Sequence, residues 1–116
     1  MSAVVLPEGY TVSADPGRLN LEVIHRFISE SYWAKNIPKS VVETMIQNSI
    51  GFGVYHGEEQ VGFARVVTDK ATFAYLADVF ILQGHRGKGL SKALMEAVLE
   101  HPCLLYTSPS RDVPAG

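Results

Sequence analysis

The sequence predicts an α+β fold in which helices flank a mostly antiparallel sheet. Apolar residues at helical spacing mark two consecutive helices, strand-like segments then follow one another, and a third helix comes last. This order does not alternate as a parallel β-α-β series does. With 116 residues, the chain has room for one domain.

The first part of the chain predicts a short strand followed by two helices. Residues 9–13 alternate weakly and end in turn-forming residues, which favours a strand. Residues 18–30 repeat apolar side chains at helical spacing, which predicts an amphipathic helix. Ser40 and Glu43 have the spacing of a capping box, which predicts a second helix that ends at Gln47.

The middle of the chain predicts three strands. Residues 51–56 and 60–68 are rich in β-forming side chains around a short turn, which indicates a hairpin. Residues 72–82 are apolar at both odd and even positions except for Asp78. Because a strand covered on both faces has this pattern, we predict that it lies at the centre of the sheet. A helix is predicted from Leu90 onwards.

A glycine-rich, basic loop joins the last predicted strand to the last helix. Gly87 and Gly89 would let a ligand approach the backbone, and Arg86, Lys88 and Lys92 add positive charge. A helix that begins there presents unpaired N–H groups, which attract phosphate. The alternative is a tight turn with solvated cations. The net charge of −2 gives no general attraction to nucleic acid or to an anionic membrane, and we predict neither as a partner.

The residues around this loop resemble a known family. Asp78-Val-Phe-Ile-Leu followed by Arg86-Gly-Lys-Gly-Leu-Ser91 resembles the acetyl-CoA-binding motif of the GNAT acyltransferases, and the order of elements over about residues 9–100 is similar to that fold. The resemblance implies that strand backbone holds the pantetheine arm of acetyl-CoA and that loop amides cradle its pyrophosphate. The implied strand residues are Val79, Phe80 and Ile81, and the implied loop residues are Arg86, Gly87, Lys88, Gly89, Leu90 and Ser91.

The function that the resemblance implies is acetyl-CoA-dependent N-acetyltransfer to a primary amine of a small molecule or a protein. The alternative is a non-catalytic acyl-CoA-binding or interaction module. Asp78 is the candidate general base, because burial in an apolar strand would favour its proton-binding form. A structural carboxylate satisfied by its neighbours is the other interpretation. Tyr32 and Trp33 could line the acceptor pocket or pack over the sheet edge.

The end of the chain departs from the family pattern. Family members continue beyond the cofactor helix, so the resemblance implies that residues 1–102 form a partial N-acetyltransferase domain that lacks its C-terminal strands. We expect that such a truncated chain is unstable or inactive, and that its exposed sheet edge allows a homodimer by strand exchange. Residues 103–116 resemble translated adaptor sequence, which predicts a disordered or non-native tail.

Cysteine and histidine usage bears on metal binding and on the cellular compartment. Cys103 is the only cysteine and the four histidines show no metal-ligand spacing, so we expect no metal. A chain without disulfides suits the reducing cytoplasm. The sequence shows neither a secretory signal nor an apolar segment near the length that spans a bilayer, so no membrane association is expected.

Overall fold

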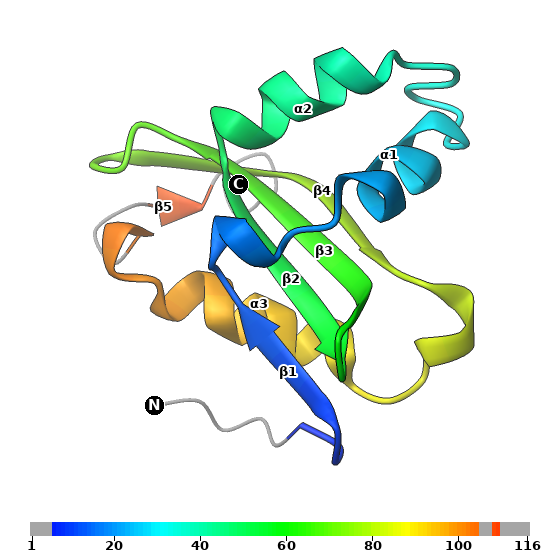
Figure 1. Cartoon of the computed structure of the whole chain (residues 1–116). Coiled ribbons are helices and arrows are strands. Elements are labelled where there is room, and N and C mark those ends of the chain that lie inside the picture. Colours follow the sequence, from blue (N-terminus) through cyan, green and yellow to red (C-terminus); the bar gives the residue numbers. More distant parts are fainter. Residues whose placement is uncertain (1–5, 105–107, 110–116) are drawn as a thin grey trace.

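A computed structural model describes residues 6–104 and 108–109 of the chain (Figure 1). Its sheet has the strand order β1-β2-β3-β4-β5, in which the first four strands are antiparallel. The strands are β1 (Tyr10–Ser13), β2 (Ile50–His56), β3 (Glu59–Thr68), β4 (Phe73–Ile81) and β5 (Ser108–Pro109). The short β5 pairs in parallel with the first two residues of β4.

Helices cover both faces of this sheet. The helices are α1 (Leu21–Ser29), α2 (Lys39–Gln47) and α3 (Leu90–Glu100). Figure 1 shows α1 and α2 on one face and α3 on the other. The predicted α+β class with a mostly antiparallel sheet is therefore confirmed. No helix of the described residues has both the length and the apolar character needed to cross a membrane.

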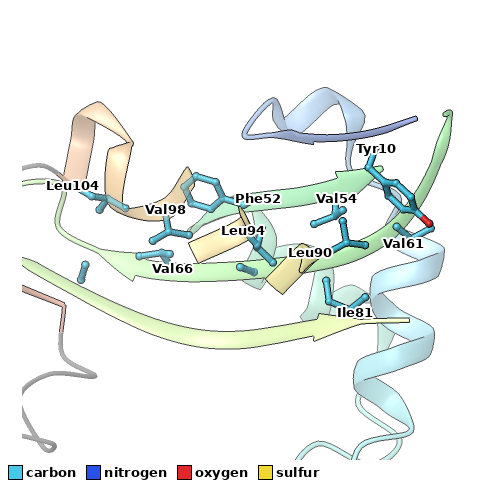
Figure 2. Packing of buried hydrophobic residues seen from close by; sticks show 12 residues of the cluster. Tyr10, Phe52, Val54, Val61, Val66, Ile81, Leu90, Leu94, Val98 and Leu104 are labelled. Atoms are coloured by element: carbon cyan, nitrogen blue, oxygen red, sulfur yellow. The ribbon is translucent and has the colours of Figure 1, made fainter. Parts of the chain in front are cut away.

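Each face of the sheet has its own apolar core. Ile24, Ile28 and Val42 from α1 and α2 pack on Phe63 and Phe80. The other core lies beneath α3 and is drawn in Figure 2. It is built by side chains of β1 to β4, of α3 and of the 3-10 turn η3 (Pro102–Leu104). The members labelled in Figure 2 are Tyr10, Phe52, Val54, Val61, Val66, Ile81, Leu90, Leu94, Val98 and Leu104. Burial of these side chains on both faces holds the helices to the sheet.

The two N-terminal helices begin at other residues than predicted. Helix α1 begins after Asn20, whose Oδ1 accepts a hydrogen bond from the Val23 N–H at 3.2 Å and caps the helix. The predicted capping box at Ser40 is wrong, because α2 begins at Lys39 and the backbone oxygen of Pro38 already accepts from the N–H groups one turn later. Ser40 therefore lies inside the first turn of α2.

The strand predicted to be central is not the central one. β3 is the middle strand, and β4 lies beside the short β5. The pairing of β3 with β4 shifts so that Ala77 of β4 is a bulge without a partner. Because the bulge exchanges odd and even positions between the two faces, Ala74 and Phe80 enter different cores although both are even-numbered. β4 is nevertheless covered on both faces, as its apolar pattern predicts, since Phe80 enters the core beneath α1 and α2 and Ile81 enters the core beneath α3.

The predicted tail falls partly within the described residues. Cys103 and Leu104 belong to η3, and Ser108–Pro109 form β5. Residues 105–107 and 110–116 lie outside the described residues.

Candidate functional site

The loop that leaves β4 has a backbone shape that favours glycine. After the 3-10 turn η2 (Gln83–His85), Gly87 and Gly89 have φ angles of 81° and 77°. Residues that carry a Cβ atom are strained at such angles. A Cβ atom at either position would meet nothing within 4 Å, so the backbone and not a lack of space favours glycine. Gly84 also faces open space, and its φ is not in this left-handed range.

Helix α3 begins at this loop without a side-chain cap. Its N-cap residue is Gly89, and its first turn holds no acidic residue. By contrast, α1 is capped by Asn20 and carries Glu22 in its first turn. The first N–H groups of α3 have no intrahelical partners, and the helix dipole adds positive potential there. This end of α3 is therefore suited to a bound anion.

A small cavity lies against the start of α3. Its volume is about 80 Å³, and it is lined by Ile81, His85, Arg86, Gly87, Gly89, Leu90 and Ser91. Five of the six predicted loop residues are among these lining residues; the sixth, Lys88, is exposed. The structure thus brings the end of β4, the loop and the first turn of α3 around one space.

Arg86 ties the loop to the end of the strand. Its Nε donates a hydrogen bond to the backbone oxygen of Ile81 at 2.7 Å. The guanidinium group therefore lies beside the last residue of β4. A charged donor in this place adds to the positive potential of the helix start.

The side chains of the predicted strand residues are divided between the two cores and the surface. Phe80 and Ile81 are buried in the two cores, whereas Val79 is 40% exposed. Within the described part of the chain, β5 pairs only with Phe73 and Ala74, so the outer edge of β4 has no strand partner beyond Ala74. A sheet edge of this kind offers N–H and C=O groups to an extended ligand.

Asp78 forms a buried ion pair on the face covered by α1 and α2. Its Oδ2 accepts a hydrogen bond from Arg65 Nε at 2.7 Å, and the two side chains are 9% and 15% exposed. Arg65 Nη1 also donates to Ser49 Oγ at 3.1 Å, and Ser49 Oγ donates to the Met45 oxygen at 2.7 Å. Asp78 therefore has the partner that a buried carboxylate needs, as the structural interpretation of this residue supposes.

A groove of about 600 Å³ runs between α2 and β3. Its lining residues are Ser40, Val41, Thr44, Met45, Asn48, Ser49, Arg65 and Val67. Apolar side chains from both elements contribute to it, and Arg65 connects it to Asp78. The sequence alone did not indicate this groove, because its two walls come from segments that are distant in the chain and no local pattern relates them.

Tyr32 and Trp33 lie in the loop between α1 and α2 and face solvent. Their side chains are 91% and 56% exposed, and their rings meet edge to face at 5.5 Å. The loop itself is held to α1, because His25 Nε2 lies 2.9 Å from the Ile37 oxygen. Neither aromatic residue lines the groove beside α2. Their role in acceptor binding stays a prediction.

No cluster of three or more His, Cys, Asp or Glu side chains that could hold a metal ion occurs among the described residues. Cys103 is exposed and free.

Comparisons with known proteins agree with this geometry. The Gibberella zeae protein named Putative acetyltransferase FG08082 is 32% identical over 111 residues, a match that covers 78% of this chain but only 63% of that protein. A crystal structure of a GNAT-family protein from Xanthomonas campestris pv. campestris is 44% identical, has a TM-score of 0.85, and covers 96% of this chain and 83% of its own.

A more distant structure shows the fold with its ligand. The GNAT acetyltransferase of Elizabethkingia anophelis, solved with acetyl-CoA bound, has a TM-score of 0.59 at 8% identity, over 80% of this chain and 57% of its own. The family model for acetyltransferases of the GNAT type matches residues 20–102, which include α1, the sheet from β2 to β4, the glycine loop and α3. The chain belongs to the GNAT acetyltransferase family.

Proposed function

We propose that this chain binds acetyl-CoA at the loop after β4 and transfers its acetyl group to a primary amine of a small molecule or a protein. The observation that carries the proposal is the uncapped start of α3 behind Gly87 and Gly89. Family membership supports it, and so does the Elizabethkingia protein, which holds acetyl-CoA in the same fold.

The cofactor would be held mainly by backbone groups. N–H groups from Gly87 to Ser91 would bind the pyrophosphate, assisted by the charges of Arg86, Lys88 and Lys92. The open edge of β4, including Val79 to Ile81, would hydrogen-bond the pantetheine arm as an added strand would. Acetyl-CoA supplies the reactive thioester, and N–H groups at this edge would polarise its carbonyl.

The groove between α2 and β3 is the acceptor site that the geometry supports best. Its apolar walls would exclude water from an amine substrate, and Arg65, which lines it, donates a hydrogen bond to Asp78. In this proposal Asp78 takes a proton from the attacking amine, and the hydrogen bond from Arg65 orients the carboxylate. Tyr32 and Trp33 lie outside this groove, so in the proposal they would contact a part of the acceptor that extends beyond it.

Binding and turnover separate the proposed enzyme from a binding module. Acetyl-CoA at 100 times its Kd should stabilise the chain by about 2.7 kcal/mol, which raises the melting temperature. Thiol release with a panel of primary amines then measures transfer. Binding with turnover supports the proposal, binding without turnover for any amine favours the non-catalytic module, and absence of binding contradicts both.

Variants of Asp78 test its role directly. If Asp78 is the general base, Asp78→Asn should lower kcat about 100-fold or more while the Kd for acetyl-CoA stays unchanged. If Asp78 is a structural carboxylate, the same substitution should lower the melting temperature and leave kcat of the folded protein close to wild type.

The predicted cytoplasmic location and homodimer belong to the same proposal. Light scattering of the purified chain measures whether it forms a dimer.

A further inference from the structure

We propose that Tyr10, on the edge strand β1, is a positioning residue that fixes the acetyl-CoA loop through His85. The proposal rests on the proposed function. Tyr10 Oη lies 2.7 Å from His85 Nδ1, across 75 residues of sequence. Tyr10 is only 9% exposed, and its hydrogen bond with His85 is partly buried.

Three aromatic rings form a cluster around this hydrogen bond. The Tyr10 ring stacks on His56, at the end of β2, with ring centres 4.4 Å apart. His85 meets the Tyr10 ring edge-on at 5.8 Å and lies 5.5 Å from the ring of His56. Figure 2 shows Tyr10 at the same end of the core as Val61 and Ile81. The cluster therefore connects the rigid sheet to η2, the turn that leads into the loop.

The position of His85 makes this connection relevant to ligand binding. His85 directly precedes Arg86 and Gly87, and it lines the same cavity as Leu90 and Ser91. The η2 turn is held by backbone bonds from His85 to Leu82 and from Arg86 to Gln83. Because Gly87 and Gly89 allow many backbone conformations, side-chain tethers decide how much order the loop has before a ligand binds.

The loop has two such tethers. Arg86 Nε binds the Ile81 oxygen, and His85 binds Tyr10. When Tyr10 donates its hydroxyl proton to Nδ1, the neutral imidazole carries its own proton on Nε2. The second ring nitrogen is then a donor, which is the kind of group that binds phosphate oxygens. The contact with Tyr10 thus holds His85 in place.

Removal of one oxygen atom tests the proposal. Tyr10→Phe should weaken acetyl-CoA binding about fivefold, measured by calorimetry, and raise the KM for acetyl-CoA while kcat at saturation is unchanged. Tyr55→Phe is the matched control, because Tyr55 is a buried tyrosine whose hydroxyl has no hydrogen-bond partner among the described residues. Equal effects of the two variants would overturn the proposal.

A double-mutant cycle shows whether Tyr10 acts through His85. In the His85→Ala background, Tyr10→Phe should cause no further loss of affinity. His85→Asn, which can keep a hydrogen-bonding atom near the position of Nδ1, should retain part of the affinity. The same fivefold loss from Tyr10→Phe in both backgrounds would show that Tyr10 acts independently of His85.

Hydrogen exchange without ligand separates this inference from the proposed function. Tyr10→Phe should increase amide exchange in residues 83–90, and Tyr55→Phe should not. If wild-type chain fails to bind acetyl-CoA, the proposed function fails, while the exchange result still tests the tether. Unchanged exchange in Tyr10→Phe would contradict the tether even if acetyl-CoA binds.

Discussion

The two ends of β4 satisfy their backbone N–H groups in different ways. In the turn before β4, Asp69 Oδ1 accepts hydrogen bonds from the N–H groups of Ala71, Thr72 and Phe73 at 2.9, 2.8 and 3.0 Å. In the loop after β4, the start of α3 has no side-chain cap. Both connections use left-handed backbone, at Lys70 in the first and at two glycines in the second.

The difference separates a closed turn from a binding loop. A carboxylate of the protein fills the first set of donors, so that turn needs no other anion. The second set has basic residues around it and no carboxylate in the first turn of the helix. A bound anion, such as the pyrophosphate of our proposal, would accept hydrogen bonds from these N–H groups, as Asp69 does in the turn before β4.

Between the two ends, the ion pair of Asp78 with Arg65 predicts the largest effect. Arg65→Met leaves a buried carboxylate without its cation and should lower the free energy of unfolding by about 3–5 kcal/mol. Denaturant-induced unfolding measures this loss. Arg65→Met combined with Asp78→Leu should recover most of it, because the unpaired charge is gone.

The exposed pair of Lys39 with Glu22 provides the control for this prediction. Lys39→Met should change the unfolding midpoint little, because solvent screens the pair. Similar losses for Lys39→Met and Arg65→Met would mean that burial does not decide the strength of the central pair.

A glycine substitution in the binding loop should have the next largest effect. Gly89→Ala places a Cβ on left-handed backbone, which costs about 1–2 kcal/mol, and should weaken acetyl-CoA binding about tenfold by displacing the first amides of α3. Calorimetry with acetyl-CoA measures the affinity. Gly84→Ala, in the same loop but outside the left-handed range, should bind like wild type.

The sequence predicted this loop well because its features are local. Gly87, Gly89 and the helical spacing that follows lie within a few residues of each other. The order of the helices and the hairpin were predicted for the same reason, whereas the first residues of α1 and α2 were not. The fold of residues 9–100 followed from the order of these local elements.

Features that join distant residues were not predictable in this way. The bulge at Ala77 has no signature in the sequence of β4, and the place of β4 beside β5 depends on strand order, which no local pattern encodes. The contact of Tyr10 with His85 joins residues 75 positions apart, and the groove beside α2 depends on how a helix packs on a strand. Only tertiary packing determines such neighbours.

The turn before β4 predicts a smaller, pH-dependent effect. Hydrogen bonds from the N–H groups of Phe73, Ala71 and Thr72 and from the Thr72 hydroxyl hold the pKa of Asp69 well below its usual range. The stabilisation is therefore complete above the ordinary pKa of about 4 and is lost as the pH falls below it towards the lowered value.

Asp69→Asn keeps an accepting oxygen but does not titrate. Wild type should melt at a higher temperature than this variant at pH 7, and the difference should shrink as the pH is lowered below about 4. Melting curves across this range measure the effect. A constant difference at all pH values would mean that the charge of Asp69 does not stabilise the turn.

The smallest effect is expected for the Tyr55 hydroxyl. It has neither an acceptor in the described part of the protein, as the N–H groups before β4 have, nor a proposed ligand, as those after β4 have. The Tyr55 hydroxyl is buried and has no hydrogen-bond partner among the described residues, and burial raises the pKa of this side chain. Tyr55→Phe removes a polar group whose desolvation is uncompensated, so the free energy of unfolding should stay the same or rise by up to about 1 kcal/mol. Chemical denaturation measures the change. A clear loss of stability would show that the hydroxyl has a partner, such as a buried water, and would place Tyr55 with the satisfied donors of the turn before β4.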